Sequence, residues 1–148
     1  MGITGVSHTS FTVSSLERSV GFYRDVLGLE IVMTMERRAQ WIAEMTGFEG
    51  AALRIAVLRW PGEEHFVELI EYEAPHVGGV ASATNVVGSA HLGFFVEDID
   101  AEYERLSAAG VQFVAPPARV AEPPSAGAWA AYFRDPDGIP LELQQRPR

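Results

Sequence analysis

The sequence contains no cysteine, and this absence limits both its redox chemistry and its metal chemistry. Without thiols the chain can form no disulfide framework and no thiolate metal site, so a bound metal would have to use imidazole and carboxylate ligands. Basic residues are also scarce, since 11 Lys and Arg face 20 Asp and Glu and give a formal net charge of −9. This balance argues against nucleic acid and anionic membrane surfaces as partners.

Long apolar runs are missing as well. No run approaches the roughly 20 residues of a bilayer-spanning helix, and the first residues lack the basic-then-apolar pattern of a secretion signal. We therefore expect a cytoplasmic location. What the chain does have is a hydrophobic content of 47% over 148 residues, which is enough for one core or two small coupled cores in a folded protein.

Two segments of the chain repeat each other. The segment HTSFTVSSLERSVGFYRDVLG begins at His8, and the shorter HLGFFVEDIDAEYERLSAAG begins at His91. The same offset of 83 residues (91 − 8) aligns Phe11 with Phe94. Because the match runs from an apolar alternation into a helical stripe and a terminal glycine, it indicates one duplicated module rather than a chance similarity.

Each copy begins with a strand whose two faces differ. In HLGFFV the apolar residues alternate with the others, which places the histidine on the face opposite the leucine. The first copy continues with apolar residues at helical spacing, with Ser14 and Glu17 spaced as a capping box and Gly28 placed to end the helix. In the second copy Asp98 is the predicted N-cap and Gly110 the predicted stop. Each helix should cover the apolar face of its own sheet and leave the histidine on the concave face.

The remainder of each copy is predicted to form three strands. They lie in EIVMTME, AALRIAVLRW and HFVELIEY in the first copy, and in VQFVA, AWAAYF and IPLELQQ in the second. The predicted fold is α+β, with βαβββ modules at residues 1–74 and 88–148 and a small, glycine-rich linker at 75–87. A short helix is predicted in RRAQWIAEMTGF, near the mouth of the site, and core packing is the alternative to substrate contact for its Trp41.

The last strand of each module places a carboxylate between apolar neighbours. These carboxylates are Glu68 in VELIEY and Glu142 in LELQQ. A buried charge at such a position is costly unless another group compensates it. If the flanking apolar residues face the helices, both glutamates share the concave face with His8 and His91. A single histidine or glutamate on a strand more often has a structural or solvated role, so the duplication is what favours a site.

These features resemble the vicinal oxygen chelate superfamily, which contains glyoxalase I, methylmalonyl-CoA epimerase, extradiol dioxygenases, fosfomycin resistance enzymes and bleomycin-binding proteins. The resemblance rests on the paired modules, on LERSVGFYRDVLGLEIV in the first copy and on the closing FRDPDGIPLELQQ. It implies that the two modules form an open, barrel-like cup around one divalent metal ion. His8, Glu68, His91 and Glu142 fall on the family's four ligand positions.

The resemblance also implies chemistry on two neighbouring oxygens of a small substrate. Four imidazole and carboxylate ligands leave two adjacent octahedral positions open, and a carboxylate beside the metal, Glu142 or Glu68, can act as the base. Nickel, zinc, cobalt, manganese and iron are all chemically admissible. Two histidines with two glutamates favour a glyoxalase-I-like lyase or isomerase. The alternatives are an extradiol-type ring-cleaving dioxygenase and a metal-free small-molecule binding or resistance protein.

The remaining predictions concern the substrate and the assembly. Phe66 and Phe95 are candidate wall residues of the cup, and Trp41 is a candidate at its mouth. Arg54 is a candidate contact for an anionic substrate, with a salt bridge as the alternative. Thr12 stands where bacterial glyoxalases carry a glutathione-binding arginine, which argues against glutathione. Because family members commonly pair and exposed sheet edges favour pairing, we expect a homodimer.

Overall fold

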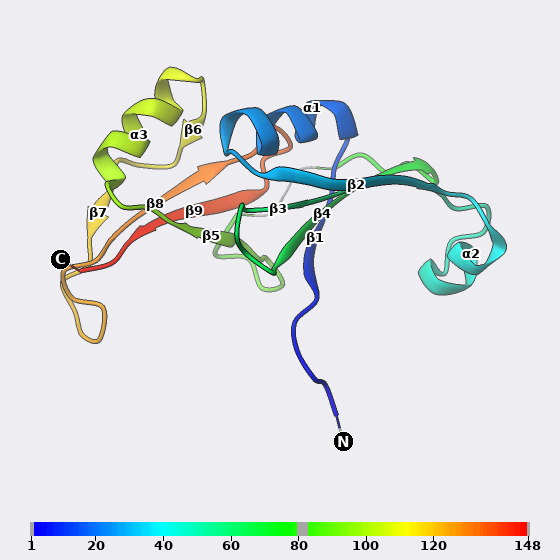
Figure 1. Ribbon diagram of the computed structural model, residues 1–148, viewed down its shortest axis with the longest axis horizontal. Helices are drawn as coiled ribbons and strands as arrows, with labels where there is room; N and C mark the ends of the chain where they lie inside the picture. Colours follow the sequence, from blue (N-terminus) through cyan, green and yellow to red (C-terminus); the bar gives the residue numbers. More distant parts are fainter. Residues whose placement is uncertain (1, 80–82, 148) are drawn as a thin grey trace. The chain divides into compact units, whose positions relative to one another are not determined.

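The computed structural model describes residues 2–79 and 83–147, and the chain divides into two compact units, residues 1–79 and 80–148. Each unit contains its own sheet and a helix that packs on it (Figure 1). The α+β class predicted from the sequence is confirmed. No helix in the described ranges is both long and apolar enough to cross a membrane.

The first unit follows the predicted order of a strand, a helix and three further strands, with a short helix inserted between the second and third strands. Its elements are β1 (His8–Thr12), α1 (Leu16–Gly21), the π-helical turn η1 (Phe22–Val26), β2 (Glu30–Arg37), α2 (Gln40–Thr46), β3 (Ala52–Arg59) and β4 (Phe66–Ala74). The strand order is β1-β4-β3-β2, in which β1 and β4 are parallel and the other neighbours antiparallel.

The second unit repeats this topology with one difference at its edge. Its elements are β5 (Leu92–Phe95), α3 (Ile99–Ala108), β6 (Gln112–Phe113), β7 (Ala118–Arg119), β8 (Trp129–Arg134) and β9 (Pro140–Gln145). The order is β5-β9-β8-β6, β5 is parallel to β9, and β7 also pairs with β8. The strand predicted in VQFVA is therefore shorter than expected. Pro116 and Pro117 follow it, and proline cannot donate a hydrogen bond to a strand ladder.

In the last strand of each unit, buried apolar residues point to one face of the sheet and a glutamate points to the other. Val67 and Leu69 of β4 are 4% and 0% exposed, and Leu141 and Leu143 of β9 are 0% and 2% exposed. These residues lie on the helix side, where α1 contacts β4 and α3 contacts β9. The glutamate between each pair of apolar residues must then point to the other face, because successive side chains of a strand alternate.

The first helix begins one residue later than the capping-box prediction required. Ser15 is the N-cap, and its Oγ accepts a hydrogen bond from the Arg18 N–H at 3.4 Å. Ser14 lies too early for this role, and its Oγ accepts a hydrogen bond from the Arg18 guanidinium at 2.8 Å. The end of the helix is as predicted, since Gly28 has a φ of +88°, a left-handed conformation that glycine adopts without strain.

Each helix is also attached to the last strand of its own sheet. The Leu16 N–H donates to Glu71 Oε2 at 2.6 Å, and the Ile99 N–H donates to Gln145 Oε1 at 2.8 Å. The two contacts occupy equivalent places, because Leu16 precedes Ile99 by 83 residues and Glu71 precedes Gln145 by 74. Asp98 caps α3 as predicted. These contacts fix which face of each sheet the helix covers, and so leave the opposite face to the candidate site.

Candidate active site

The first of two His–Glu pairs lies on the face of the first sheet that is opposite α1. The backbone register sets His8 against Phe66 and Ser10 against Glu68. Because residues two apart on a strand share a face, His8 and Glu68 are diagonal neighbours on the same face. The distance from His8 Nε2 to Glu68 Oε2 is 3.4 Å, and the side chains are 43% and 25% exposed. We call these two residues the first pair.

The second pair, His91 and Glu142, has the same arrangement in the second unit. Gly93 lies opposite Glu142 in the register of β5 and β9, and His91 is two residues before Gly93. The distance from His91 Nε2 to Glu142 Oε2 is 3.3 Å, with side chains 39% and 10% exposed. Each predicted histidine thus lies beside the glutamate of its own module, in the same register in both units.

The donor atoms of each pair are spaced as two ligands of one divalent ion would be. For metal–ligand distances of about 2.1 Å, two ligands at a right-angled or tetrahedral spacing are about 3.0 to 3.4 Å apart. Imidazole nitrogen and carboxylate oxygen also suit the divalent transition metals considered above. Within residues 2–79 and 83–147, no cluster of three or more His, Cys, Asp or Glu side chains is placed to hold a metal ion. Each unit by itself therefore offers two ligands.

On the β3 and β4 side the neighbours of the first pair are apolar, whereas on the β1 side Ser10 lies opposite Glu68 and the Ser7 hydroxyl is 3.1 Å from His8 Nδ1. Val57 lies opposite Glu68, and Ile55 lies opposite Ile70, in the register of β3 and β4. Both β3 residues belong to a buried cluster that Ile42 of α2 completes. The partly buried residues packed against this cluster are Met35, Phe66, Ile70 and Tyr72. Phe66 thus lies on the face of the first pair, and its role as a wall residue of a substrate site stays a prediction.

The predicted short helix is present as α2. Of its residues, Ile42 rather than Trp41 packs into the core. Ile42, at 1% exposed, is the residue that joins the core. Trp41 is 49% exposed, so core packing does not account for it. Its contact with a substrate stays a prediction.

The surroundings of the second pair are polar. Tyr132 lies opposite Glu142 in the register of β8 and β9, and its ring meets the His91 ring edge-on with centroids 5.1 Å apart. Gln144 Nε2 donates a hydrogen bond to Glu142 Oε2 at 3.0 Å. The pKa of Tyr132 is raised above its ordinary value, first because burial disfavours the phenolate and second because the Glu142 carboxylate repels it. Sequence reasoning missed both Tyr132 and Gln144.

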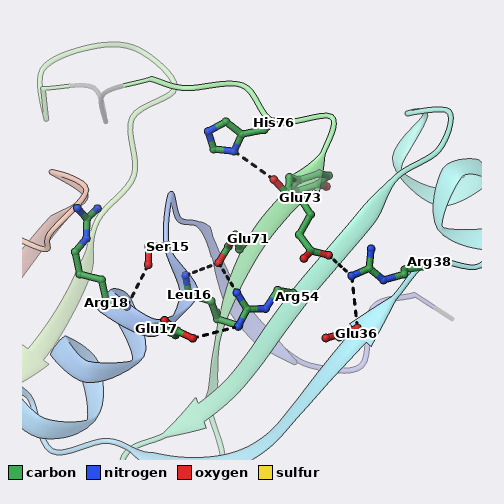
Figure 2. A network of polar contacts seen from close by, with 11 residues as sticks. Ser15, Leu16, Glu17, Arg18, Glu36, Arg38, Arg54, Glu71, Glu73 and His76 are labelled. Carbon is green, nitrogen blue, oxygen red and sulfur yellow. Dashed lines mark hydrogen bonds and ion pairs between the residues drawn. The ribbon is translucent and has the colours of Figure 1, made fainter.

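Arg54 lies on the opposite face of the first sheet, away from the first pair. Its register partner is Glu71, three residues after Glu68, and an odd separation reverses the face. The guanidinium lies 3.4 Å from Glu71 and 3.8 Å from Glu17, near the start of α1 (Figure 2). These contacts agree with the salt-bridge alternative for Arg54 and do not support a role in a site at the first pair.

A comparison with known proteins identifies the family. Residues 5–143 match the model of the Glyoxalase/Bleomycin resistance protein/Dioxygenase superfamily. The chain belongs to this superfamily. This confirms the resemblance drawn from the repeated modules and the closing motif.

Two relatives of this superfamily member carry the names of enzymes. A 2-epi-5-epi-valiolone epimerase from Actinomyces sp. is 34% identical over 150 residues, which cover 99% of this chain and 81% of that protein. A lactoylglutathione lyase from Haemophilus influenzae is 29% identical over 140 residues, which cover 93% of this chain and 90% of the relative. The two names support an activity of the lyase or isomerase type.

A solved structure of the same family has the same fold. The glyoxalase family protein from Bacillus cereus superposes with a TM-score of 0.85 and 23% identity, covering 100% of this chain and 97% of that chain. At this identity the likeness concerns the fold. It agrees with the α+β architecture of two sheets described above.

Proposed function

We propose that the protein is a metal-dependent epimerase or lyase that transfers protons on a small substrate with two neighbouring oxygens. The observation that carries the proposal is the repetition of one His–Glu pair in the same register in both units, with separations of 3.4 Å and 3.3 Å. Membership of the superfamily and the names of the two relatives support this class of reaction.

In this proposal His8, Glu68, His91 and Glu142 together hold one divalent ion. The bound ion supplies Lewis-acid polarisation of a carbonyl group, which acidifies the neighbouring C–H bond. One of the two glutamates accepts that proton. In an epimerisation, the other glutamate would donate a proton to the opposite side of the same carbon, a role for which a second carboxylate is suited. The duplicated module supplies one from each unit.

In this proposal the apolar side chains of β3 and β4 would limit the access of water to Glu68 from their side. Phe66, Ile70 and Val57 bring no hydrogen-bonding side chain to the face that carries Glu68. Proton transfer between a carboxylate and a C–H bond is favoured where water does not compete for the carboxylate. The first unit is therefore suited to the apolar side of a substrate.

Metal analysis tests the ligand assignment. Protein loaded with Ni²⁺, Co²⁺, Zn²⁺ or Mn²⁺ and then dialysed should retain a single ion, and His8→Ala and His91→Ala should lose it while circular dichroism shows an unchanged fold. His76→Ala is a matched control, because this exposed histidine bonds to the Tyr72 carbonyl oxygen. Unchanged metal content in both His8 and His91 variants would overturn the assignment. Selective retention of Fe²⁺ with oxygen-dependent cleavage of catechol would indicate a dioxygenase instead.

Hydrogen exchange with solvent tests the reaction. The metal-loaded protein is incubated in D₂O with 2-epi-5-epi-valiolone or with the methylglyoxal–glutathione hemithioacetal, and NMR follows deuterium at carbon. We expect deuterium to enter the substrate, because the proton removed by a glutamate exchanges with solvent. Glu68→Gln and Glu142→Gln should each abolish this exchange. Glu97→Gln, an exposed change outside both pairs, should leave the exchange intact. If exchange persists in both glutamate variants, the two carboxylates do not transfer the proton.

A further inference from the structure

One arginine is held over an exposed aromatic ring on the face of the second sheet that carries the second pair. The guanidinium carbon of Arg146 lies 4.1 Å from the centroid of the Phe95 ring, and Phe95 is 63% exposed. Phe95 lies opposite Gln144 in the register of β5 and β9. Gln144 is two residues from Glu142, so Phe95 and Glu142 share one face, and Arg146, just beyond the end of β9, reaches this face through its contact with the Phe95 ring.

In the described residues Arg146 has no carboxylate partner, a feature that it shares with Arg37 and Arg119, but it alone of the three lies over an aromatic ring beside the second pair. In the first unit Arg54 pairs with Glu71 and Arg59 pairs with Glu30. Among residues 2–79 and 83–147, no acidic side chain forms an ion pair with Arg146, although the chain has 20 acidic residues against 11 basic ones. A cation without a partner in so acidic a chain is a candidate for an anion supplied from outside.

The contact with the Phe95 ring leaves Arg146 able to bind such an anion. A guanidinium that lies over a ring uses its flat face and keeps its N–H edges free to donate. These edges match the two oxygens of a carboxylate. The ring also restricts the long side chain before any ligand arrives, which lowers the entropy lost on binding.

The stack is not a requirement of the module, because the first unit lacks it. The residue equivalent to Arg146 is Tyr72, 74 positions earlier, and the residue equivalent to Phe95 is Thr12, 83 positions earlier. Tyr72 packs edge-on against Phe48 with ring centroids 6.1 Å apart. The same fold therefore forms with an aromatic contact in place of the cation.

We propose that Arg146 and Phe95 form a subsite for a carboxylate of the substrate, an inference that rests on the proposed function and favours an acidic substrate over a neutral polyhydroxy ketone such as 2-epi-5-epi-valiolone. One guanidinium balances one negative charge, and with a net charge of −9 the chain disfavours a dianionic group such as phosphate. Phe95 is two residues beyond Gly93, which lies opposite Glu142. Two strand residues span about 7 Å, so the carboxylate should lie roughly that far from the oxygens that reach the metal.

Hydroxamates offer a direct test, because they chelate metals through two neighbouring oxygens. Calorimetry on the Ni²⁺-loaded protein compares two alkyl hydroxamates of equal length, one ending in a carboxylate and the other in a methyl group. We expect the carboxylate-ended probe to bind about tenfold more tightly, as a hydrogen bond between charged groups allows. Varying the chain length should give a maximum preference at the length that spans the subsite.

Variants separate the subsite from the metal. Arg146→Gln should abolish the preference and leave binding of the methyl-ended probe unchanged. Arg119→Gln is the matched control and should keep the preference, because Arg119 lies opposite Trp129, whose partner Gln145 is on the helix side. Equal binding of the two probes, or a preference that survives Arg146→Gln, overturns this inference alone. Failure of both probes to bind overturns the proposed metal site and the subsite together.

Discussion

The two units have the same strand order and place the His–Glu pair in the same register, but the surroundings of the pair differ. Where the first unit has Val57 opposite Glu68, the second has Tyr132 opposite Glu142. Where the first has Ile70, the second has Gln144, the equivalent residue 74 positions later. The pairing of strands therefore sets where the candidate ligands lie, whereas the neighbouring side chains set the environment in which each works.

The difference extends to the two carboxylates themselves. Glu142 is 10% exposed as a side chain and accepts a hydrogen bond from Gln144, so its orientation is restricted. Glu68 is 25% exposed, and in the described part of the chain its polar contact is the one with His8. Under the proposed function, the second unit holds its carboxylate in place, and the first allows its carboxylate more movement.

The largest expected effect is on stability, and it tests the feature that the two units share, which is a buried leucine in the last strand of each. Leu69 and Leu143 are equivalent, and both are almost fully buried, at 0% and 2% exposed. Leu69→Ala and Leu143→Ala should each lower the free energy of unfolding by about 3 kcal/mol, since each removes apolar burial and leaves a cavity. Urea unfolding followed by circular dichroism measures the loss, and Val114→Ala, at an exposed site, serves as control. A much smaller loss in one variant would show that one unit is loosely packed there.

The next effect tests the hydrogen bond from a neighbouring side chain to the glutamate, which in the described residues the second pair has and the first does not. Gln144→Leu removes the hydrogen bond to Glu142 and should weaken Ni²⁺ binding about tenfold, because groups that orient a metal ligand contribute to affinity. Ile70→Leu, at the equivalent position of the first unit, should leave the affinity unchanged. Competition with a coloured chelator gives both constants. Equal Ni²⁺ affinity in the two variants would mean that the different surroundings of the two pairs do not affect metal binding.

The smallest effect concerns the pH dependence of Tyr132. Its pKa in the folded protein is raised above the unfolded value of about 10, by burial and by the Glu142 carboxylate. The unfolded state therefore loses this proton first, and stability falls as the pH rises from the unfolded pKa towards the folded one. Tyr132→Phe should lessen that fall, as measured by urea unfolding across this pH range.

The first unit supplies the control for the same titration. Glu142→Gln should lower the pKa of Tyr132 without restoring the ordinary value, because burial remains. Glu68→Gln should leave the tyrosine titration unchanged, because its register partner is Val57. The difference in phenolate absorbance between each variant and its Tyr132→Phe counterpart isolates this one residue. An equal shift in both variants would contradict the local origin of the effect.

The faces of the strands could be predicted from the sequence because alternation is a local property. The placement of His91 away from Leu92, and of Glu142 between two buried leucines, follows from residues next to each other in the chain. Gln144 could have been found in the same way, since it is two residues after Glu142. The N-cap was misplaced because Ser14 and Ser15 are both suitable caps, and the choice depends on where the chain leaves β1.

The remaining contacts depend on strands that pair from distant parts of the sequence. Tyr132 reaches Glu142 through the register of β8 and β9, and Arg146 reaches Phe95 only because β5 lies beside β9. The sequence alone did not decide whether Arg54 contacts the substrate or forms a salt bridge, because its partner Glu71 is set by the pairing of β3 and β4. The metal, its identity and the homodimer stay predictions.

The parallel pairing of the first and last strands of each unit has a consequence for how the chain is made. During synthesis β1 emerges early, but its ladder partner β4 and the Glu71 carboxylate that receives the Leu16 N–H come more than 50 residues later. Until then both the strand and the first turn of α1 lack those partners, and contacts between distant residues form slowly. β5 depends on β9 in the same way. A ribosome making this chain therefore delivers two sheets in succession, each closing only when its last strand arrives.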